Sequence, residues 1–191
     1  MDYDIDKIKN RIKKISEYSK SRENDPVGNQ NCLLCSLSLE LFFRGINMMP
    51  RAVYSPRDPL FKLRNACFAD YARKIRIKNK NEIKHMLEQE ENSRYYCHVR
   101  WKNSKSGHEF IIANIQSKIY VLDAQAGICA SIDSKDADHY FNDIDYNESY
   151  ILRIDNKDVN KKYIRINSIK PLKWETEDEK YLESSHCDLV K

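Results

Sequence analysis

The chain changes character at about residue 92, from helix-forming segments to short strand-forming segments. Before this point, apolar residues recur at spacings of three and four, which is the period of an amphipathic helix. After it, short runs rich in aromatic and β-branched residues are separated by polar turns, as in a sheet. Helices followed by strands, instead of a regular alternation of the two, favour antiparallel pairing over βαβ units. The predicted fold class is therefore α+β, with N-terminal helices packed on an antiparallel β-sheet.

The helices and strands can be placed by residue range. Helices are predicted over residues 5–18, 32–44, 60–75 and 79–91, with a short one inserted between strands at 133–143. In the second of them, Leu33, Leu37 and Leu41 form one apolar stripe, and Gly45 is placed to end the helix. Strands are predicted over residues 93–101, 107–115, 118–125, 149–154 and 162–169.

A chain of 191 residues suits one domain with a sizeable core. No internal repeat, low-complexity tract or linker divides it in two. We predict a main domain over residues 26–170, preceded by an N-terminal amphipathic helix in residues 1–25 and followed by an acidic C-terminal segment in residues 171–191. Residues 1–25 are a docking element, a chaperone-binding segment or part of the fold, and the sequence leaves these alternatives open.

The charge balance and the lack of long apolar runs argue against a nucleic-acid partner, a membrane span and a Sec signal. The chain has 33 basic and 29 acidic residues, a net charge of +4, and the excess is dispersed. We therefore expect no nucleic-acid partner. No run of about 18 apolar residues is present, so no membrane span is expected. The first residues lack an apolar segment, so no Sec signal is expected either.

Two of the six cysteines lie in the segment "NQNCLLCSL", residues 29–37, at the start of a predicted helix. The backbone N–H groups and the dipole of a helix N-terminus favour a thiolate, so a reactive thiol is one interpretation. Side chains of Asn29, Gln30 and Asn31, with the N–H of Cys32, are candidates for an oxyanion hole. The alternatives are two small core residues, half of a zinc site, or a disulfide. The zinc site lacks a second CxxC or HxxxH, and the irregular cysteine spacing argues for reduced thiols.

A nucleophilic cysteine needs a base, and the chain has five histidines. His85 lies on a charged helix, His139 in a polar helix and His186 in the tail. His98 lies within a strand, and the alternative to a catalytic role is a structural residue whose hydrogen bonds are made within the sheet. His108 differs because it follows Gly107 and opens a strand, where a side chain can face a cleft.

The strands that follow form a predicted hairpin, "HEFIIANIQSKIYVLDAQ". With the turn centred on Gln116 and Ser117, position 108 pairs with 125 and position 110 with 123. His108, Asp123 and Gln125 then share one face at the open end of the hairpin, within about 5–8 Å of one another. A buried carboxylate needs a partner, and His108 is the nearest candidate. The alternative is that Asp123 ends the strand with a turn bond.

Cysteine, histidine and aspartate then follow in chain order, each at the end of an element. In the general logic of such a set, His108 takes the proton of the thiol, while Asp123 fixes the imidazole tautomer and stabilises the imidazolium. Cys35 lies one helical turn beyond Cys32 and is expected to face the core.

The segments "NCLLCSLSLELFFRG", "GHEFIIAN" and "YVLDAQAG" together resemble the papain-fold toxin family of bacterial polymorphic toxins and effectors. That family's pattern has Asn-Cys at the start of a helix, Arg-Gly at its end, Gly-His opening a strand and Asp-x-Gln ending the next. All four parts occur here, as residues 31–32, 44–45, 107–108 and 123–125. The resemblance covers residues 28 to about 130 and leaves 1–25 and 155–191 outside it.

The resemblance implies a papain-like catalytic domain with Cys32, His108 and Asp123 as the catalytic triad, without cofactor or metal. It implies a hydrolase, a protein glutamine deamidase that works through a thioester, and Gln125 as a support for the acid or the substrate amide. It also implies an effector secreted without a Sec signal, acting in the cytosol of a host or competitor cell on a protein that carries the target glutamine. A cognate immunity protein that inhibits it is a further implied partner.

The same triad supports other reactions, so the alternatives are a papain-like cysteine protease and a transglutaminase-type acyltransferase. A non-catalytic papain-like binding module and a protein with a structural metal also stay open.

Overall fold

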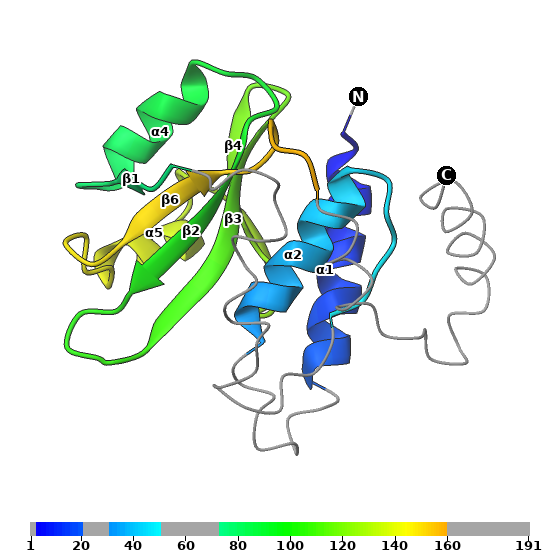
Figure 1. The fold of residues 1–191 in the computed structure, drawn as a ribbon, viewed down its shortest axis with the longest axis horizontal. Coiled ribbons are helices and arrows are strands. Elements are labelled where there is room, and N and C mark those ends of the chain that lie inside the picture. Colours follow the sequence, from blue (N-terminus) through cyan, green and yellow to red (C-terminus); the bar gives the residue numbers. More distant parts are fainter. Residues whose placement is uncertain (1–2, 21–30, 51–72, 160–191) are drawn as a thin grey trace.

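A computed structural model describes residues 3–20, 31–50 and 73–159 of the chain, and the following account concerns these residues. They form helices and strands in the order α1 (Ile5–Lys20), α2 (Cys32–Phe43), β1 (Ile75–Arg76), α4 (Lys80–Glu88), β2 (Arg94–Arg100), β3 (Gly107–Ile115), β4 (Lys118–Asp123), β5 (Ile128–Ser131), α5 (Lys135–Asn142) and β6 (Tyr150–Arg153). The fold class is α+β, as predicted, and all the strands belong to one sheet (Figure 1).

The sheet has the strand order β1-β6-β2-β3-β4-β5, and every neighbouring pair is antiparallel. Its central hairpin is β3–β4, in which Ile111 lies opposite Leu122 and Ile115 opposite Lys118. The turn residues Gln116 and Ser117 have φ angles of 51° and 60°, as in the two-residue turns whose twist matches that of the strands. The predicted turn and register are therefore confirmed.

Helices cover both faces of the sheet, so the described residues form two hydrophobic cores. On one face, α1 and α2 lie side by side against residues such as Ile111, Ala113 and Leu122 (Figure 1). On the other face, α4 and α5 cover the alternate residues, such as Phe110 and Val121. Because neighbouring residues of a strand point to opposite faces, the strands β2 to β6 contribute to both cores.

Helix α2 is buried almost all round, which differs from the single stripe predicted from Leu33, Leu37 and Leu41. Ten of its twelve residues are buried, including Ser36, Ser38 and Glu40. The reason is its place in the fold, since α1 lies on one side of it and β3 on another. The hydroxyl of Ser36 donates to the backbone carbonyl of Glu109, so the first turns of α2 are held beside the first residues of β3.

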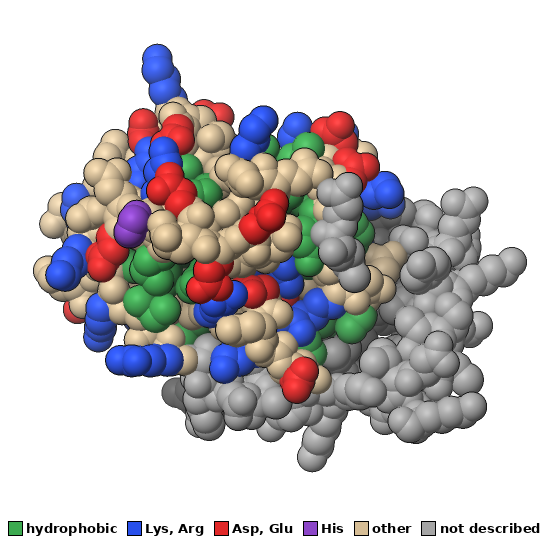
Figure 2. Space-filling model, turned by 90° about the horizontal axis from the view of Figure 1, so that it is seen from above, with side chains coloured by type: hydrophobic (Ala, Val, Ile, Leu, Met, Phe, Trp, Pro, Cys, Tyr) green, Lys and Arg blue, Asp and Glu red, His purple; other side chains and the backbone are tan. Residues whose placement is uncertain are grey.

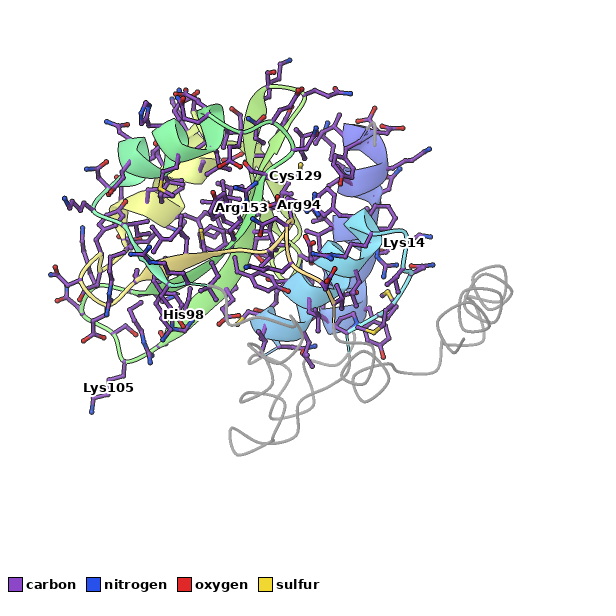
Figure 3. All side chains as sticks on the ribbon, turned by 45° about the horizontal axis from the view of Figure 1, so that its top comes forward. Lys14, Arg94, His98, Lys105, Cys129 and Arg153 are labelled. Carbon is purple, nitrogen blue, oxygen red and sulfur yellow. The ribbon has the colours of Figure 1, made fainter. Side chains whose placement is uncertain are left out.

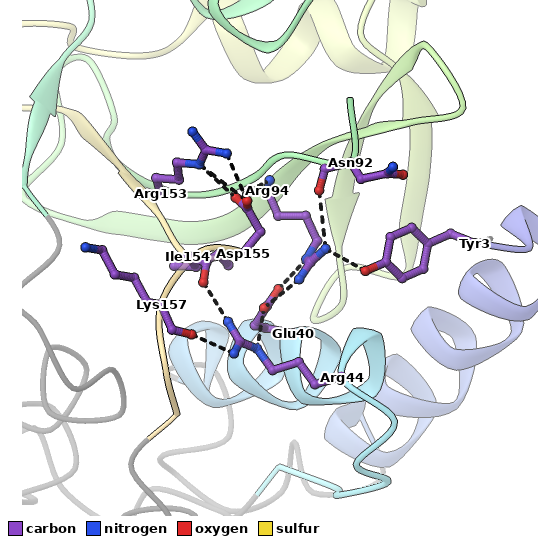
Figure 4. Close-up of polar contacts among 9 residues, drawn as sticks. All are labelled: Tyr3, Glu40, Arg44, Asn92, Arg94, Arg153, Ile154, Asp155 and Lys157. Atoms are coloured by element: carbon purple, nitrogen blue, oxygen red, sulfur yellow. Dashed lines mark hydrogen bonds and ion pairs between the residues drawn. The ribbon is translucent and has the colours of Figure 1, made fainter. Parts of the chain in front are cut away.

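A network of buried charges ties the middle of α2 to the ends of β2 and β6 (Figure 4). The fully buried carboxylate of Glu40 accepts two hydrogen bonds from Arg94, at 2.7 and 3.0 Å, and one from Arg44 at 2.8 Å. Arg44 also donates to the carbonyls of Ile154 and Lys157, just beyond β6. A buried carboxylate is tolerated when it is paired in this way, and here the pairing fixes the position of α2.

Most predicted elements that fall on described residues are present. The helices predicted at 5–18, 32–44, 79–91 and 133–143 correspond to α1, α2, α4 and α5, and four predicted strands correspond to β2, β3, β4 and β6. Strands β1 and β5 were not predicted, and Ile75, taken as the last residue of a helix, lies in β1. Residues 73 and 74 of that predicted helix are described and are not helical, while residues 60–72, the strand at 162–169 and the predicted domain boundaries lie outside the described residues.

The N-terminal helix contributes to the same core as α2. Ile8, Ile12 and Ile15 are buried in it, and Cys129 of β5 packs against this core, where Figure 3 shows it between the sheet and α1. The hydroxyl of Ser16 donates to the carbonyl of Gln125, in the turn after β4. Within the described residues, α1 is therefore part of the packing around that turn.

The described surface is mixed in charge. Figure 2 shows acidic and basic side chains interspersed over one face, with hydrophobic side chains in small separate groups. Lys105 projects from the tip of the loop between β2 and β3 (Figure 3). None of the helices in the described ranges is both long enough and apolar enough to cross a membrane.

Candidate active site

His108 opens β3 at the end of the sheet, and its backbone lies close to β2. A Cβ atom on Gly107 would lie 2.7 Å from the carbonyl oxygen of Val99, so only glycine fits before the histidine. The side chain of His108 shares a face with Phe110 and is mostly buried, with 17% of it exposed. The sequence around His108 thus holds the imidazole at an edge where one side of the ring stays accessible.

Asp123 ends β4 and is hydrogen-bonded through both of its oxygens. Its Oδ2 lies 2.6 Å from His108 Nε2 and accepts a hydrogen bond of 2.7 Å from the Tyr140 hydroxyl. Its Oδ1 accepts the backbone N–H groups of Gln125 and Ala126, at 3.0 and 2.9 Å. The predicted contact with His108 is confirmed, and the alternative turn bond forms as well, because each interpretation uses a different oxygen.

Cys32 is the first residue of α2, and its thiol is half-buried. The side chains of Asn79 and Ser134 cap α4 and α5 by accepting a hydrogen bond from the first turn, whereas the Asn31 side chain makes no such bond to α2. Asn31 is 5% exposed, and its Oδ1 has no hydrogen-bond partner among the described residues. The first N–H groups of a helix lack partners within the helix, so those of α2 are not capped by this side chain.

The pKa of His108 reflects both of its neighbours. Burial lowers this pKa, but hydrogen bonds to Asp123 and to Cys32, with the charges of both, raise it from 6.5 to about 10. Because Nε2 is bonded to Asp123, the other ring nitrogen, Nδ1, is the one left for the thiol. The Asp123 carboxylate and the Cys32 thiol thus both act on the His108 imidazole, so the three residues form one electrostatically connected set.

The Asp123 carboxylate is held in its charged form. Burial raises the pKa of Asp123, but the hydrogen bond and the charge of His108, with further bonds from Ala126 and Tyr140, lower it overall. The pKa of the Tyr140 hydroxyl is raised by burial and by the neighbouring Asp123 charge, so it stays a hydrogen-bond donor. The negative charge of Asp123 favours the protonated, imidazolium form of His108 beside the Cys32 thiol.

The two cysteines of α2 differ in their surroundings. Cys35 is fully buried, and burial raises its pKa strongly, so this thiol stays protonated. This agrees with the prediction that it faces the core. The described cysteines Cys32, Cys35, Cys97 and Cys129 are all free thiols, while Cys67 and Cys187 lie outside the described residues.

Two aromatic residues at the site were missed by the sequence analysis. Tyr140 of α5 donates to Asp123, and the Trp101 ring stacks on the His108 ring with centroids 6.1 Å apart and planes 22° apart. Tyr140 lies 17 residues after Asp123 on a separate helix, so no local pattern links the two. Trp101 follows β2, and its position beside His108 depends on the pairing of Val99 with His108, which a six-residue loop does not specify.

The other residues considered as site candidates are distributed over the structure, and some lie outside the described ranges. The Nδ1 atom of His98 lies 2.8 Å from Glu109, on the opposite face of the sheet from His108, as expected of a satisfied sheet histidine. His85 is exposed on α4, whereas His139, exposed on α5, lines a pocket together with His108 and Asp123. Asn29, Gln30 and His186 are outside the described residues. The backbone N–H of Gln125 bonds to Asp123, which places this residue at the site.

Within the described residues, no group of three or more His, Cys, Asp and Glu side chains could hold a metal ion. Comparison of the chain with protein-family models finds no match, and comparison with curated proteins finds none either.

Proposed function

We propose that this protein is a cysteine-dependent hydrolase of papain-like fold that deamidates glutamine side chains of other proteins. Cys32 is the nucleophile, His108 the general acid and base, and Asp123 the group that orients the imidazole. One observation carries the proposal: the His108 imidazole is hydrogen-bonded to Asp123 at 2.6 Å and interacts with Cys32 at the start of α2. The resemblance to the papain-fold toxin family supports the same residues.

The chemistry follows from the geometry. With the proton on His108, Cys32 is a thiolate, which the N-terminus of α2 stabilises. In this scheme the sulfur attacks the carboxamide carbon of a glutamine, and N–H groups of the first turn of α2, which the Asn31 side chain does not cap, stabilise the oxyanion that forms. His108 then gives its proton to the departing ammonia, which leaves a thioester on Cys32.

Water completes the reaction. His108, now neutral, takes a proton from a water molecule that attacks the thioester, and the C–S bond breaks. The products are a glutamate side chain and the Cys32 thiolate, and the imidazolium is restored. The net change is one carboxamide and one water converted into one carboxylate and one ammonium. In this scheme the protein acts without a cofactor, as an effector in the cytosol of a host or competitor cell, and an immunity protein is a proposed partner.

The test is mass spectrometry of proteins from a target-cell lysate incubated with the wild-type protein or with the Cys32→Ala variant. The expected result is glutamine-to-glutamate conversion at specific sites with the wild type and not with Cys32→Ala. Cys129→Ala is the matched control, because Cys129 is also a half-buried thiol but lies on β5. New peptide termini in place of converted glutamines would assign the same triad to a protease, and equal spectra for all three proteins would contradict the proposal.

A further inference from the structure

A pocket of about 240 Å³ lies between α1 and the end of α2. The described residues that line it are Lys7, Asn10, Arg11 and Lys14 of α1, Phe42 of α2 and Asn47 of the segment that follows α2. Three of these side chains are cations, two are amides and none is acidic. The charge of the described lining is therefore of one sign, which favours an anion as the occupant.

The basic side of the pocket follows from the spacing of residues along α1. The four lining residues of this helix fall at positions 7, 10, 11 and 14, so they lie on one face of it. The alternate face carries Ile8, Ile12 and Ile15, which are buried in the core shared with α2. The packing of these isoleucines thus fixes which side of α1 borders the pocket.

The other side of the pocket is formed where α2 ends. Gly45 has a φ angle of 78°, its N–H donates to the carbonyl of Phe42, and the N–H of Ile46 donates to the carbonyl of Leu41. These two bonds are those of the turn that commonly ends a helix at glycine. The turn brings Asn47 into the lining, and Figure 3 shows Lys14 on the side of α1 next to this segment.

Arg11 is the buried cation of the pocket, with 5% of the residue exposed. Its Nη2 atom donates to the hydroxyl of Ser38 at 3.3 Å and to the carbonyl of Met48. The guanidinium carbon lies 5.7 Å from the centre of the Phe42 ring. Because these contacts already hold the guanidinium in place, an anion that binds it costs little side-chain entropy.

The two lysines of the pocket are exposed and available to a ligand. Within the described ranges, Lys7 and Lys14 form no ion pair, whereas Lys9 and Lys13 each pair with an acidic side chain of α1. Three like charges around one small pocket repel one another, and a bound anion removes this repulsion.

We propose that this pocket binds a phosphate monoester, carried either by a small soluble molecule or by the headgroup of a lipid. Such a group has a charge of about −1.5 to −2 at pH 7 and three strong acceptor oxygens. Guanidinium, ammonium and amide groups all supply donors to these oxygens. The volume is below the range of about 300–1,000 Å³ that is usual for larger ligands, which suits a headgroup.

The site is separate from the proposed triad. Cys32 is the first residue of α2, and Phe42 is close to its last, so about 15 Å of helix lies between them. The inference therefore goes beyond the proposed function and does not depend on it.

The first arm of the test uses glycerol 3-phosphate, a soluble phosphate monoester, which is titrated into the isotope-labelled full chain. The measurement is the NMR shift of backbone amides and of asparagine side-chain amides. We expect saturable shifts at Asn10, at Asn47 and at their neighbours on α1. Dimethyl phosphate, a diester with a single charge, is the control ligand and should bind several-fold more weakly.

Two double variants of α1 distinguish the pocket from general electrostatic attraction. Lys7→Gln with Lys14→Gln removes two charges from the pocket, and Lys9→Gln with Lys13→Gln removes two charges outside it. All four lysines are exposed, so both proteins should fold. The pocket variant should bind on the order of tenfold more weakly, because it loses charged hydrogen bonds. In about 0.15 M salt, where distant exposed charges are screened, the control variant should match the wild type.

The second arm identifies the source of the phosphate. The proteins are mixed with phosphatidylcholine vesicles that contain phosphatidic acid, whose headgroup is a phosphate monoester. The control vesicles contain phosphatidylglycerol, a diester, at equal total charge. Binding to phosphatidic acid that the pocket variant loses indicates a lipid headgroup. Saturable NMR shifts without vesicle binding indicate a soluble ligand, and either result supports the inference.

Three results would overturn the phosphate pocket. The first is that neither glycerol 3-phosphate nor phosphatidic acid binds the wild-type protein. The second is an equal loss of affinity in the two double variants, which would assign the binding to the overall charge of α1. The third is that the monoesters bind no better than the diesters.

Discussion

At the scale of single residues, the central feature is that both oxygens of the Asp123 carboxylate accept hydrogen bonds. Two backbone N–H groups bond to Oδ1, while His108 and Tyr140 bond to Oδ2. The turn after β4 therefore fixes one oxygen, and the other is shared between the imidazole and the phenol. Such an arrangement orients the His108 ring and also sets its pKa, because the carboxylate charge stabilises the imidazolium.

Replacing Asp123 with Asn should move the pH dependence of the proposed activity. The proposed mechanism needs a protonated His108, whose pKa is raised to about 10, so the alkaline limb of kcat/KM should lie near this pH in the wild type. The Asn side chain removes the charge, so the limb should move toward about 6.5. We also expect kcat/KM to fall on the order of 10²–10⁴-fold. An unchanged alkaline limb in the variant would contradict the role assigned to Asp123.

Replacing Tyr140 with Phe should shift the same limb in the opposite direction. The change removes one of the two donors to Oδ2, at 2.7 Å, and leaves the aromatic ring in the core. The carboxylate is then a stronger acceptor for His108, so the imidazolium should persist to higher pH. The measurement is kcat/KM against pH. Tyr146→Phe is the control, because its hydroxyl bonds to the carbonyl of Phe141. A downward shift in Tyr140→Phe would show that the phenol has a different role.

At the scale of elements, the position of helix α2 decides whether the thiol meets the imidazole. Its first turn is held beside β3 by the bond from Ser36 to the Glu109 carbonyl, and its middle is tied to β2 through Glu40 and Arg94. Its first turn lacks the side-chain cap that α4 and α5 have. The helix is thus fixed by contacts along its length, and its N-terminus stays available to the proposed oxyanion.

Replacing Glu40 with Gln should lower the free energy of unfolding substantially. The carboxylate is fully buried and pairs with Arg94 and Arg44, and the change leaves these cations without their counter-ion. Breaking a buried pair in this way costs about 3–5 kcal/mol. Chemical denaturation would measure it. The matched control is Glu17→Gln, whose partner Lys13 is 3.9 Å away on the surface, and which should stay within about 0.5 kcal/mol of the wild type. Equal stabilities of the two variants would contradict the structural role of the network.

At the scale of the whole molecule, the sequence predicted those parts of the site that depend on local pattern. The β3–β4 register followed from a two-residue turn and a period of two, which together placed His108 and Asp123 on one face. Tyr140 and Trp101 were missed, because their contacts depend on how α5 and β2 pack against that hairpin. Strand β5 was missed because it has four residues and carries no alternating pattern. The single stripe assigned to α2 was too narrow, because burial on several sides is decided by the helices and strands around it.

The ion pair at the site should also appear in the pH dependence of global stability. The folded-state pKa of His108 is above its ordinary value of 6.5, so the pair stabilises the fold fully below pH 6.5. This stabilisation should be lost as the pH rises from 6.5 through about 10. The measurement is the difference in unfolding free energy between the wild type and Asp123→Asn across this range. The difference should shrink toward high pH, and a difference that grows with pH would contradict the pairing.

The most direct test of the central claim is the rate at which iodoacetamide alkylates Cys32 at pH 6, read for each cysteine by mass spectrometry. An ordinary thiol is almost entirely protonated at this pH and reacts slowly. Because the His108 imidazolium and the N-terminus of α2 favour a thiolate, we predict that Cys32 reacts faster than free glutathione and faster than Cys129. His108→Ala should remove this advantage. A Cys32 that reacts no faster than glutathione in the wild-type protein would contradict the proposed catalytic triad.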